Sequence, residues 1–94
     1  MRIIWSRRAI QHLTHVRDYI ARENPESAKD IAGRILEAVD RLATYPNLGR
    51  PGRKPGVREL VVPGTPYIIP YRIRGERVEL IAVFHGRQRW TDLL

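Results

Sequence analysis

The side chains best suited to chemistry gather near the end of the chain. An apolar segment, Val78 to Phe84, runs directly into His85, Arg87, Arg89 and Trp90. An imidazole with a pKa near neutrality can act as a general acid or base. Guanidinium groups bind phosphate and carboxylate through a planar fork of donors. The segment is therefore predicted to contact a charged partner.

One reaction that such residues could perform is RNA cleavage by the RNA's own 2′-hydroxyl. It requires a base, a proton donor and cations that stabilise the developing phosphorane charge. His85 or Glu59 could be the base, Tyr71 the donor, and Arg72 with Arg87 the cations. A lone histidine at a strand end more often has a structural hydrogen-bonding role. The sequence therefore favours a structural His85 over a catalytic one.

Metal and cofactor chemistry find little support. His12 and His15 lie three residues apart on a predicted helix, but no third ligand stands at helical spacing. The glycines of Gly49 to Arg53 match neither the phosphate-loop nor the dinucleotide-binding spacing. We expect no metal and no cofactor.

The elements that position these residues must belong to one small domain. The chain has 94 residues, 43% of them hydrophobic, and no cysteine. This length supports a single core, so residues 1–94 are expected to form one domain. The apolar run Ile3 to Trp5 is far shorter than a signal-peptide core, and no later run approaches a membrane span. We expect a soluble, unprocessed, cytoplasmic protein without disulfides.

The charge is strongly positive. The formal net charge is +7, from 17 basic and 10 acidic residues, and 15 of the basic residues are arginine. Residues 1–45 carry a net charge of +2 and residues 46–94 carry +5. The composition favours acidic partners, although small basic domains also bind nucleic acid nonspecifically.

The first half of the chain predicts a strand and two helices. Arg2 to Trp5 is prone to form a strand, and Ser6 can cap a helix from about Arg7 to Arg22. Asn24-Pro25-Glu26 has the residue types of a second helix start, and Pro46 ends that helix. The short connection predicts an antiparallel helical hairpin.

The second half predicts a basic loop and three strands. The loop from Asn47 to Gly56 carries Arg50, Arg53 and Lys54 without an acid, and we expect a mobile basic arm. The predicted strands, which form an antiparallel meander, are Val57–Val62, Tyr67–Ile73 and Val78–His85. The fold class is α+β, in the order β-α-α-β-β-β, with the hairpin packed on one face of a small, mainly antiparallel sheet. A local irregularity is expected at Pro70, which cannot donate to a strand ladder.

Alternation along the strands predicts one covered and one open sheet face. The covered face would include Val78, Leu80, Ala82 and Phe84. The open face would carry an apolar strip ringed by polar residues; the strip is Val61, Ile68, Ile81 and Val83, and the ring is Glu59, Arg72 and His85. Such a strip usually marks a protein partner or a dimer interface. The alternative is that the tail containing Trp90 covers it.

Several segments, taken in order, resemble the RelE/ParE toxin superfamily of bacterial type II toxin-antitoxin systems. They are I-I-W-S, Y-I-A-R-E-N-P-E-S-A, L-A-T-Y-P-N-L-G-R-P-G-R, V-R-E-L-V-V, P-Y-I-I-P-Y-R-I and V-F-H-G-R-Q-R-W. The resemblance covers essentially the whole chain. It implies the fold described above and a protein antitoxin, whose extended and helical acidic segment would lie across the toxin and neutralise its charge.

Two branches of the superfamily act differently. RelE-like members cleave messenger RNA on the ribosome, whereas ParE-like members poison DNA gyrase and are often described as plasmid stabilisation proteins. The segments G-R-P-G-R, R-E-L, G-T-P-Y and H-G-R-Q-R-W are similar to ParE-like sequences. RelE-like nucleases tend to have an arginine where Tyr67 stands and a terminal Tyr or His-Tyr where this chain has Arg87, Arg89 and Trp90.

The leading hypothesis is therefore a ParE-like toxin that inhibits gyrase by binding it and is not an enzyme. Its expected target-binding residues are Arg50, Arg53, Lys54, Arg58, His85, Arg87, Arg89 and Trp90. Its expected antitoxin-binding residues are Val61, Ile68, Arg72, Ile81 and Val83. Two alternatives stay open, a ribosome-dependent endoribonuclease and a non-toxic binding module. The sequence leaves open a homodimer or a toxin-antitoxin hetero-oligomer, and it indicates no membrane partner.

Overall fold

The computed structural model describes residues 1–88, so the predicted target residues Arg89 and Trp90 lie outside the described residues. Its elements in chain order are β1 (Arg2–Trp5), α1 (Arg7–Ala21), α2 (Pro25–Thr44), β2 (Arg50–Pro51), β3 (Arg58–Val61), β4 (Tyr67–Arg74), β5 (Arg77–Leu80) and β6 (Phe84–His85). No helix within the described part is both long and apolar enough to cross a membrane.

The helical hairpin begins and ends at the predicted signals. The Ser6 hydroxyl accepts a hydrogen bond of 3.0 Å from the Ala9 N–H and caps α1. The Asn24 side chain accepts a bond of 3.1 Å from the Ser27 N–H, with Pro25 at the first helical position of α2. These local signals set the residues at which the two helices begin.

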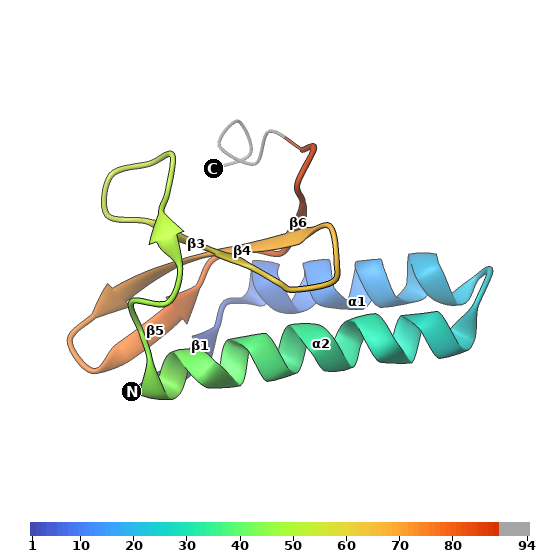
Figure 1. The fold of residues 1–94 in the computed structure, drawn as a ribbon, viewed down its shortest axis with the longest axis horizontal. Coiled ribbons are helices and arrows are strands. Elements are labelled where there is room, and N and C mark those ends of the chain that lie inside the picture. Colours follow the sequence, from blue (N-terminus) through green and yellow to red (C-terminus); the bar gives the residue numbers. More distant parts are fainter. Residues whose placement is uncertain (89–94) are drawn as a thin grey trace.

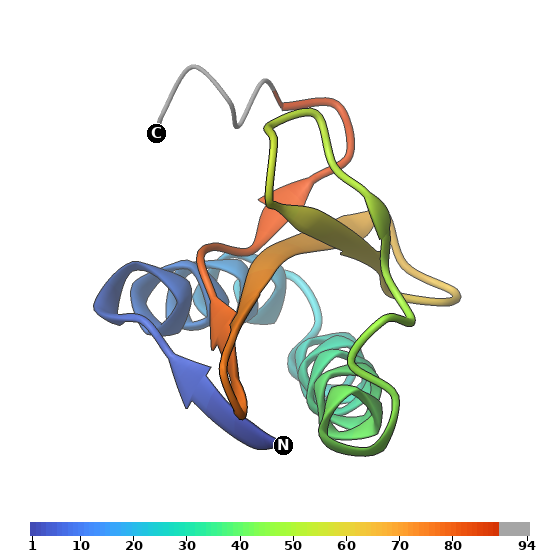
Figure 2. The ribbon, with the colours of Figure 1, turned by 90° about the vertical axis from the view of Figure 1, so that its left-hand side faces the viewer.

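The sheet has the strand order β1-β5-β4-β3-β2, and β6 also pairs with β4. β1 is parallel to β5, and the other neighbours are antiparallel. The two helices lie along one side of the sheet, while the loop between α2 and β3 and residues 86–88 after β6 extend on the other side (Figures 1 and 2). The predicted α+β class with a mainly antiparallel sheet is confirmed.

The main core lies between the helices and the sheet. α2 contributes Ile35, Val39 and Leu42, all at most 1% exposed. The facing sheet residues include Leu60, Ile69, Tyr71, Val78 and Leu80. α1 packs against this cluster with partly buried Leu13, Val16 and Ile20. Burying this apolar area is the dominant favourable contribution to folding.

The predicted irregularity at Pro70 is a β-bulge. Tyr71 pairs with Leu80, but Ile68 pairs with Phe84, so three residues of the last strand segment stand opposite two residues of β4. The Ile81 N–H donates to the Pro70 carbonyl at 2.9 Å. The Pro70 nitrogen also faces the last strand, but it carries no hydrogen and cannot donate the second hydrogen bond of a regular antiparallel pair. Regular pairing therefore stops at Pro70.

The bulge overturns the predicted division of the sheet faces. Val83 joins the main core with Val78 and Leu80, whereas Ala82 and Phe84 pack with Val57 in a second, smaller cluster. The extra residue exchanges the faces of the side chains that follow it. The prediction that Val78, Leu80, Ala82 and Phe84 share one face is wrong.

The prediction of an open apolar strip is also wrong. Val83 is 3% exposed and Ile68 is 8% exposed, and Ile81 is half-buried against the second cluster. Only Val61 is well exposed, at 46%. The four residues therefore form no continuous apolar surface.

His12 on α1 binds a backbone donor at the bulge. Its Nδ1 accepts a hydrogen bond of 3.2 Å from the Val83 N–H, a donor that the interrupted ladder leaves unused. Its ring packs against Phe84 with a centroid separation of 5.1 Å. Because Nδ1 acts as an acceptor, this contact requires the neutral imidazole.

We expect this contact to weaken in acid. Burial lowers the pKa of His12 below 6.5, and the charges of Arg8 and His15 lower it further. The unfolded chain therefore binds more protons, and the stabilisation, complete above about pH 6.5, is lost as the pH falls through the lower folded-state pKa. Urea unfolding between pH 7.5 and 5 measures this loss.

The control for this pH dependence is His15, which lies exposed on the same helix. The variant His12→Gln should lose much of the difference in unfolding free energy between pH 7.5 and 5, whereas His15→Gln should keep most of it. An unchanged pH dependence in His12→Gln would contradict the assignment.

Candidate functional site

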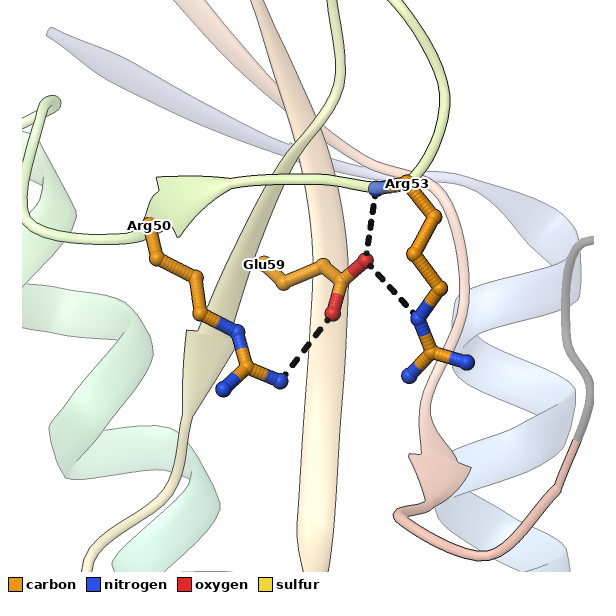
Figure 3. A network of polar contacts seen from close by, with 3 residues as sticks. All are labelled: Arg50, Arg53 and Glu59. Carbon is orange, nitrogen blue, oxygen red and sulfur yellow. Dashed lines mark hydrogen bonds and ion pairs between the residues drawn. The ribbon is translucent and has the colours of Figure 1, made fainter.

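The basic loop between α2 and β3 is held by a buried carboxylate. Glu59 on β3 is 2% exposed. Its Oε1 accepts from Arg50 Nη2 at 3.3 Å, and its Oε2 lies 3.0 Å from the Arg53 backbone N–H and 3.4 Å from Arg53 Nε (Figure 3). One carboxylate thus fixes two of the predicted target-binding arginines.

Tyr71 on β4 holds the start of the same loop from the main core. Its hydroxyl donates to the Pro46 carbonyl at 2.6 Å and accepts from the Gly49 N–H at 2.9 Å. Arg58 donates to the Gly49 carbonyl at 2.6 Å and to the Asn47 carbonyl at 3.4 Å. Burial raises the pKa of Tyr71, although the Gly49 hydrogen bond and the Arg58 charge oppose this shift. The phenol therefore stays protonated and holds both bonds.

These contacts correct the expectation of a mobile arm. The loop contains no acid, but Glu59 follows it on β3 and folds back beneath it. A two-residue strand, β2, also pairs with β3 at Arg58 and Glu59. The loop from residue 46 to residue 53 is therefore tied to the sheet.

Gly49 is required by the close approach of the loop to Tyr71. A Cβ atom at Gly49 would lie 2.6 Å from Tyr71 Cε1, 2.8 Å from its hydroxyl oxygen and 3.0 Å from the Glu59 carbonyl oxygen. The ring and the backbone cannot move aside cheaply, so Gly49→Ala is expected to lower the free energy of unfolding by about 1–3 kcal/mol. Urea unfolding measures this change.

Gly33 provides the matched control. It lies inside α2, and a Cβ there would meet nothing within 4 Å. Gly33→Ala should stabilise the protein by about 0.5–1 kcal/mol, because alanine favours the helix. Equal effects of the two substitutions would show that the loop is not sterically clamped.

His85 lies in a turn at the end of β6. The Nδ1 of His85 accepts a hydrogen bond from the Arg87 backbone N–H at 3.2 Å, and the backbone N–H of His85 donates to the Gln88 side chain at 2.9 Å. Its ring meets the Tyr67 ring edge-on at a centroid separation of 5.8 Å. These contacts give His85 a structural part in the turn, which leaves Arg87 exposed.

The residues proposed for RNA cleavage do not come together. His85 stands opposite Tyr67 at the start of β4, whereas Arg72 lies about 16 Å further along that strand at about 3.3 Å per residue. Tyr71 points into the main core, on the face opposite Arg72, and its hydroxyl is already engaged. The carboxylate of Glu59 is occupied by arginines. No shared reaction centre forms among these residues.

Those of the predicted target-binding residues that the structure describes fall into two segments on the same side of the sheet. Arg50, Arg53, Lys54 and Arg58 belong to the loop and its junction with β3, and His85 and Arg87 belong to the C-terminal turn. Both segments project away from α2 (Figures 1 and 2). The cluster of Val57, Ala82 and Phe84 links the end of the loop to the bulge. The arrangement can present cations to an acidic partner, and the described residues of these two segments form no acid-base pair.

The sequence analysis did not single out Arg8 and Arg74, which line a cavity together with Arg72. The three arginines line a cavity of about 490 Å³ where β1 and the start of α1 meet β4 and β5. A strand followed by helices can pair in parallel with a later strand of the same sheet. This rule could have indicated that residues 2–5 lie beside the last strand. The Pro46 and Gly49 contacts of Tyr71 had no local signal.

Comparison with known proteins accords with this geometry. The family model for the ParE toxin of the type II toxin-antitoxin system parDE matches residues 3–90. The chain belongs to the ParE toxin family. A ParE-family toxin of this kind is the toxin component of a type II system and has a cognate antitoxin as its partner.

Individual relatives of this ParE-family toxin cover nearly the whole chain. The putative toxin Y4kP of Sinorhizobium fredii is 46% identical over 93 residues, covering 99% of this chain and 96% of that protein. Toxin RelE2 of Caulobacter vibrioides is 38% identical over 84 residues, covering 89% and 93%. A solved structure of the chromosomal ParDE toxin-antitoxin system from P. aeruginosa superimposes with a TM-score of 0.82 at 31% identity, covering 90% of this chain and 95% of that chain.

Proposed function

We propose that this toxin inhibits DNA gyrase by binding it, without a catalytic step of its own. The observation that carries the proposal is the separation of the acid-base candidates His85, Tyr71 and Glu59, each engaged in structural contacts. Membership of the ParE family supports gyrase as the target. The tied basic loop and the C-terminal turn supply the contact surface.

Purified toxin should block gyrase-dependent supercoiling or trap cleaved DNA. The assay uses relaxed plasmid, ATP and a titration of toxin over gyrase. Supercoiling that stays unaffected at high toxin excess would refute the proposal.

Lys54 and Arg87 allow the contact surface to be tested without disturbing the fold. Neither side chain has a hydrogen bond or ion pair within residues 1–88. The double variant Lys54→Glu and Arg87→Glu is expected to raise the half-inhibitory toxin concentration about tenfold or more, through lost attraction and added repulsion. Arg17→Glu on exposed α1 makes the same kind of charge change away from the loop and should inhibit like the parent. Equal inhibition by the parent and both variants would show that the contact surface lies elsewhere on the toxin.

A ribosome-dependent endoribonuclease is the second candidate, favoured by the 38% identity to a protein named toxin RelE2. Primer extension on translated message tests it directly. New 5′ ends that appear only with ribosomes would support it, and their absence would exclude it. Unaffected growth on induction without antitoxin would indicate a non-toxic binding module instead.

A further inference from the structure

We propose that the arginine-lined cavity beside β1 binds an acidic side chain of the antitoxin, together with the aliphatic residue next to it. The inference rests on the antitoxin partner and not on gyrase as the target. Two of the residues expected from the sequence to bind antitoxin, Arg72 and Ile81, line this cavity. The other three, Val61, Ile68 and Val83, do not belong to its lining.

The cavity has an apolar wall and a cationic rim. Its volume is about 490 Å³, which is large enough for a few side chains of a partner. Ile4, Leu80 and Ile81 supply the apolar wall. Ser6 lies at the junction, where its hydroxyl is already used, donating to the Ile81 carbonyl at 3.0 Å and capping α1. The wall therefore offers apolar contact rather than free hydroxyl donors.

Arg72 has no ion pair with any of the residues that the structure describes. It stands opposite Glu79 in the ladder, but the Glu79 carboxylate pairs with Arg74 at 3.4 Å and with Arg77 at 3.7 Å. Within residues 1–88 Arg72 has no ion pair and no side-chain hydrogen bond, although it is half-buried. A partly desolvated guanidinium without an acceptor gains most from a carboxylate that binds both of its prongs.

The charge balance also favours an anion. The lining contains three arginines, Arg8, Arg72 and Arg74, and one acid, Glu79, and the whole chain has a net charge of +7. An incoming carboxylate would therefore reduce repulsion among the cations as well as pair with Arg72.

The lining favours an acidic peptide over a nucleic acid. Single-stranded nucleic acids are usually held by aromatic side chains that stack on bases. No aromatic residue lines this cavity in the described part of the chain, and its wall is aliphatic. An aspartate or glutamate beside a leucine, isoleucine or valine matches both the rim and the wall.

The probe is the cognate antitoxin, purified after co-expression and separated from the toxin. Arg72→Glu is expected to raise the dissociation constant for this antitoxin about 10- to 100-fold, the loss expected for a charge-assisted hydrogen-bonded pair. Arg72→Lys keeps the charge but not the fork, so its effect should be intermediate. Isothermal titration calorimetry measures all three proteins.

Arg17→Glu is the matched control, because it makes the same charge change on exposed α1. Its dissociation constant should stay within about twofold of the parent, since exposed charges distant from a contact are largely screened. Thermal unfolding of each variant shows that the fold is retained. Replacement of one acidic residue of the antitoxin by arginine should restore tight binding to the Arg72→Glu toxin. The residue that does so is the one whose side chain enters the cavity.

Three outcomes decide the inference. Parental affinity of Arg72→Glu for the antitoxin overturns it. A loss of DNA affinity in Arg72→Glu, with antitoxin affinity unchanged, also overturns it and assigns the cavity to phosphate. If the parent protein fails to inhibit gyrase while Arg72→Glu still loses antitoxin affinity, the inference stands and the proposed target is wrong.

Discussion

Glu59→Ala is expected to lower the free energy of unfolding by about 3 kcal/mol, at the lower end of the effect of breaking a buried ion pair. The carboxylate is 2% exposed and receives one backbone and two guanidinium contacts. We expect the lower end of this range because the Arg50 and Arg53 side chains are about half exposed and can be hydrated when the carboxylate is removed. The Arg53 N–H would lose its acceptor, and the loop would lose its tie to β3. Urea unfolding gives the change directly.

Glu79→Ala is the control, since this glutamate also pairs with two arginines, Arg74 and Arg77. Glu79 is 27% exposed, so its loss should cost less than about 1 kcal/mol. If gyrase is the target, Glu59→Ala should also inhibit supercoiling less well at temperatures where it is folded. Equal destabilisation by the two substitutions would contradict a clamping role for Glu59.

Tyr71→Phe is expected to lower the free energy of unfolding by about 2 kcal/mol, because it leaves a buried donor and a partly buried acceptor without partners. The Gly49 N–H and the Pro46 carbonyl both depend on the Tyr71 hydroxyl. The ring itself remains, so the packing of the main core is retained. Urea unfolding and amide hydrogen exchange of Gly49 measure the effect, and exchange should accelerate there.

Tyr67→Phe removes the same hydroxyl four residues earlier on the same strand. The Tyr67 hydroxyl makes no hydrogen bond to the described residues, although its side chain is also buried in the main core. Its removal should change the free energy of unfolding by no more than about 0.5 kcal/mol. A loss in Tyr67→Phe as large as that in Tyr71→Phe would show that the ring, and not the two loop bonds, carries the effect.

The parts of the fold that could be predicted depend on local signals. Ser6, Asn24 and Pro25 act on neighbouring backbone, so the starts of both helices follow from the sequence. The irregularity at Pro70 could be predicted for the same reason, because proline lacks the donor wherever it stands.

The parts that could not be predicted depend on contacts distant in sequence. The segment from Val78 to Phe84 is apolar at both odd and even positions after Leu80, so alternation alone could not reveal the face exchange at the bulge. The prediction of a mobile loop rested on the absence of acids within it, but the loop is bound by Glu59, which lies just beyond it in sequence. The binding of Tyr71 to Pro46 spans 25 residues. The candidate site is made chiefly of such contacts, so its residues could be named but their arrangement could not.

The pairing of β1 with β5 has a consequence for how the toxin is made. Arg2 to Trp5 find their strand partner in Arg77 to Leu80, at the other end of the described chain. Contacts so far apart in sequence form late, because the intervening chain must first be synthesised and closed into a loop. A growing chain that has not reached Leu80 therefore exposes the apolar side chains of Ile3 and Trp5 to chaperones and proteases. Toxin whose synthesis stops early should be degraded rather than accumulate as an active fragment.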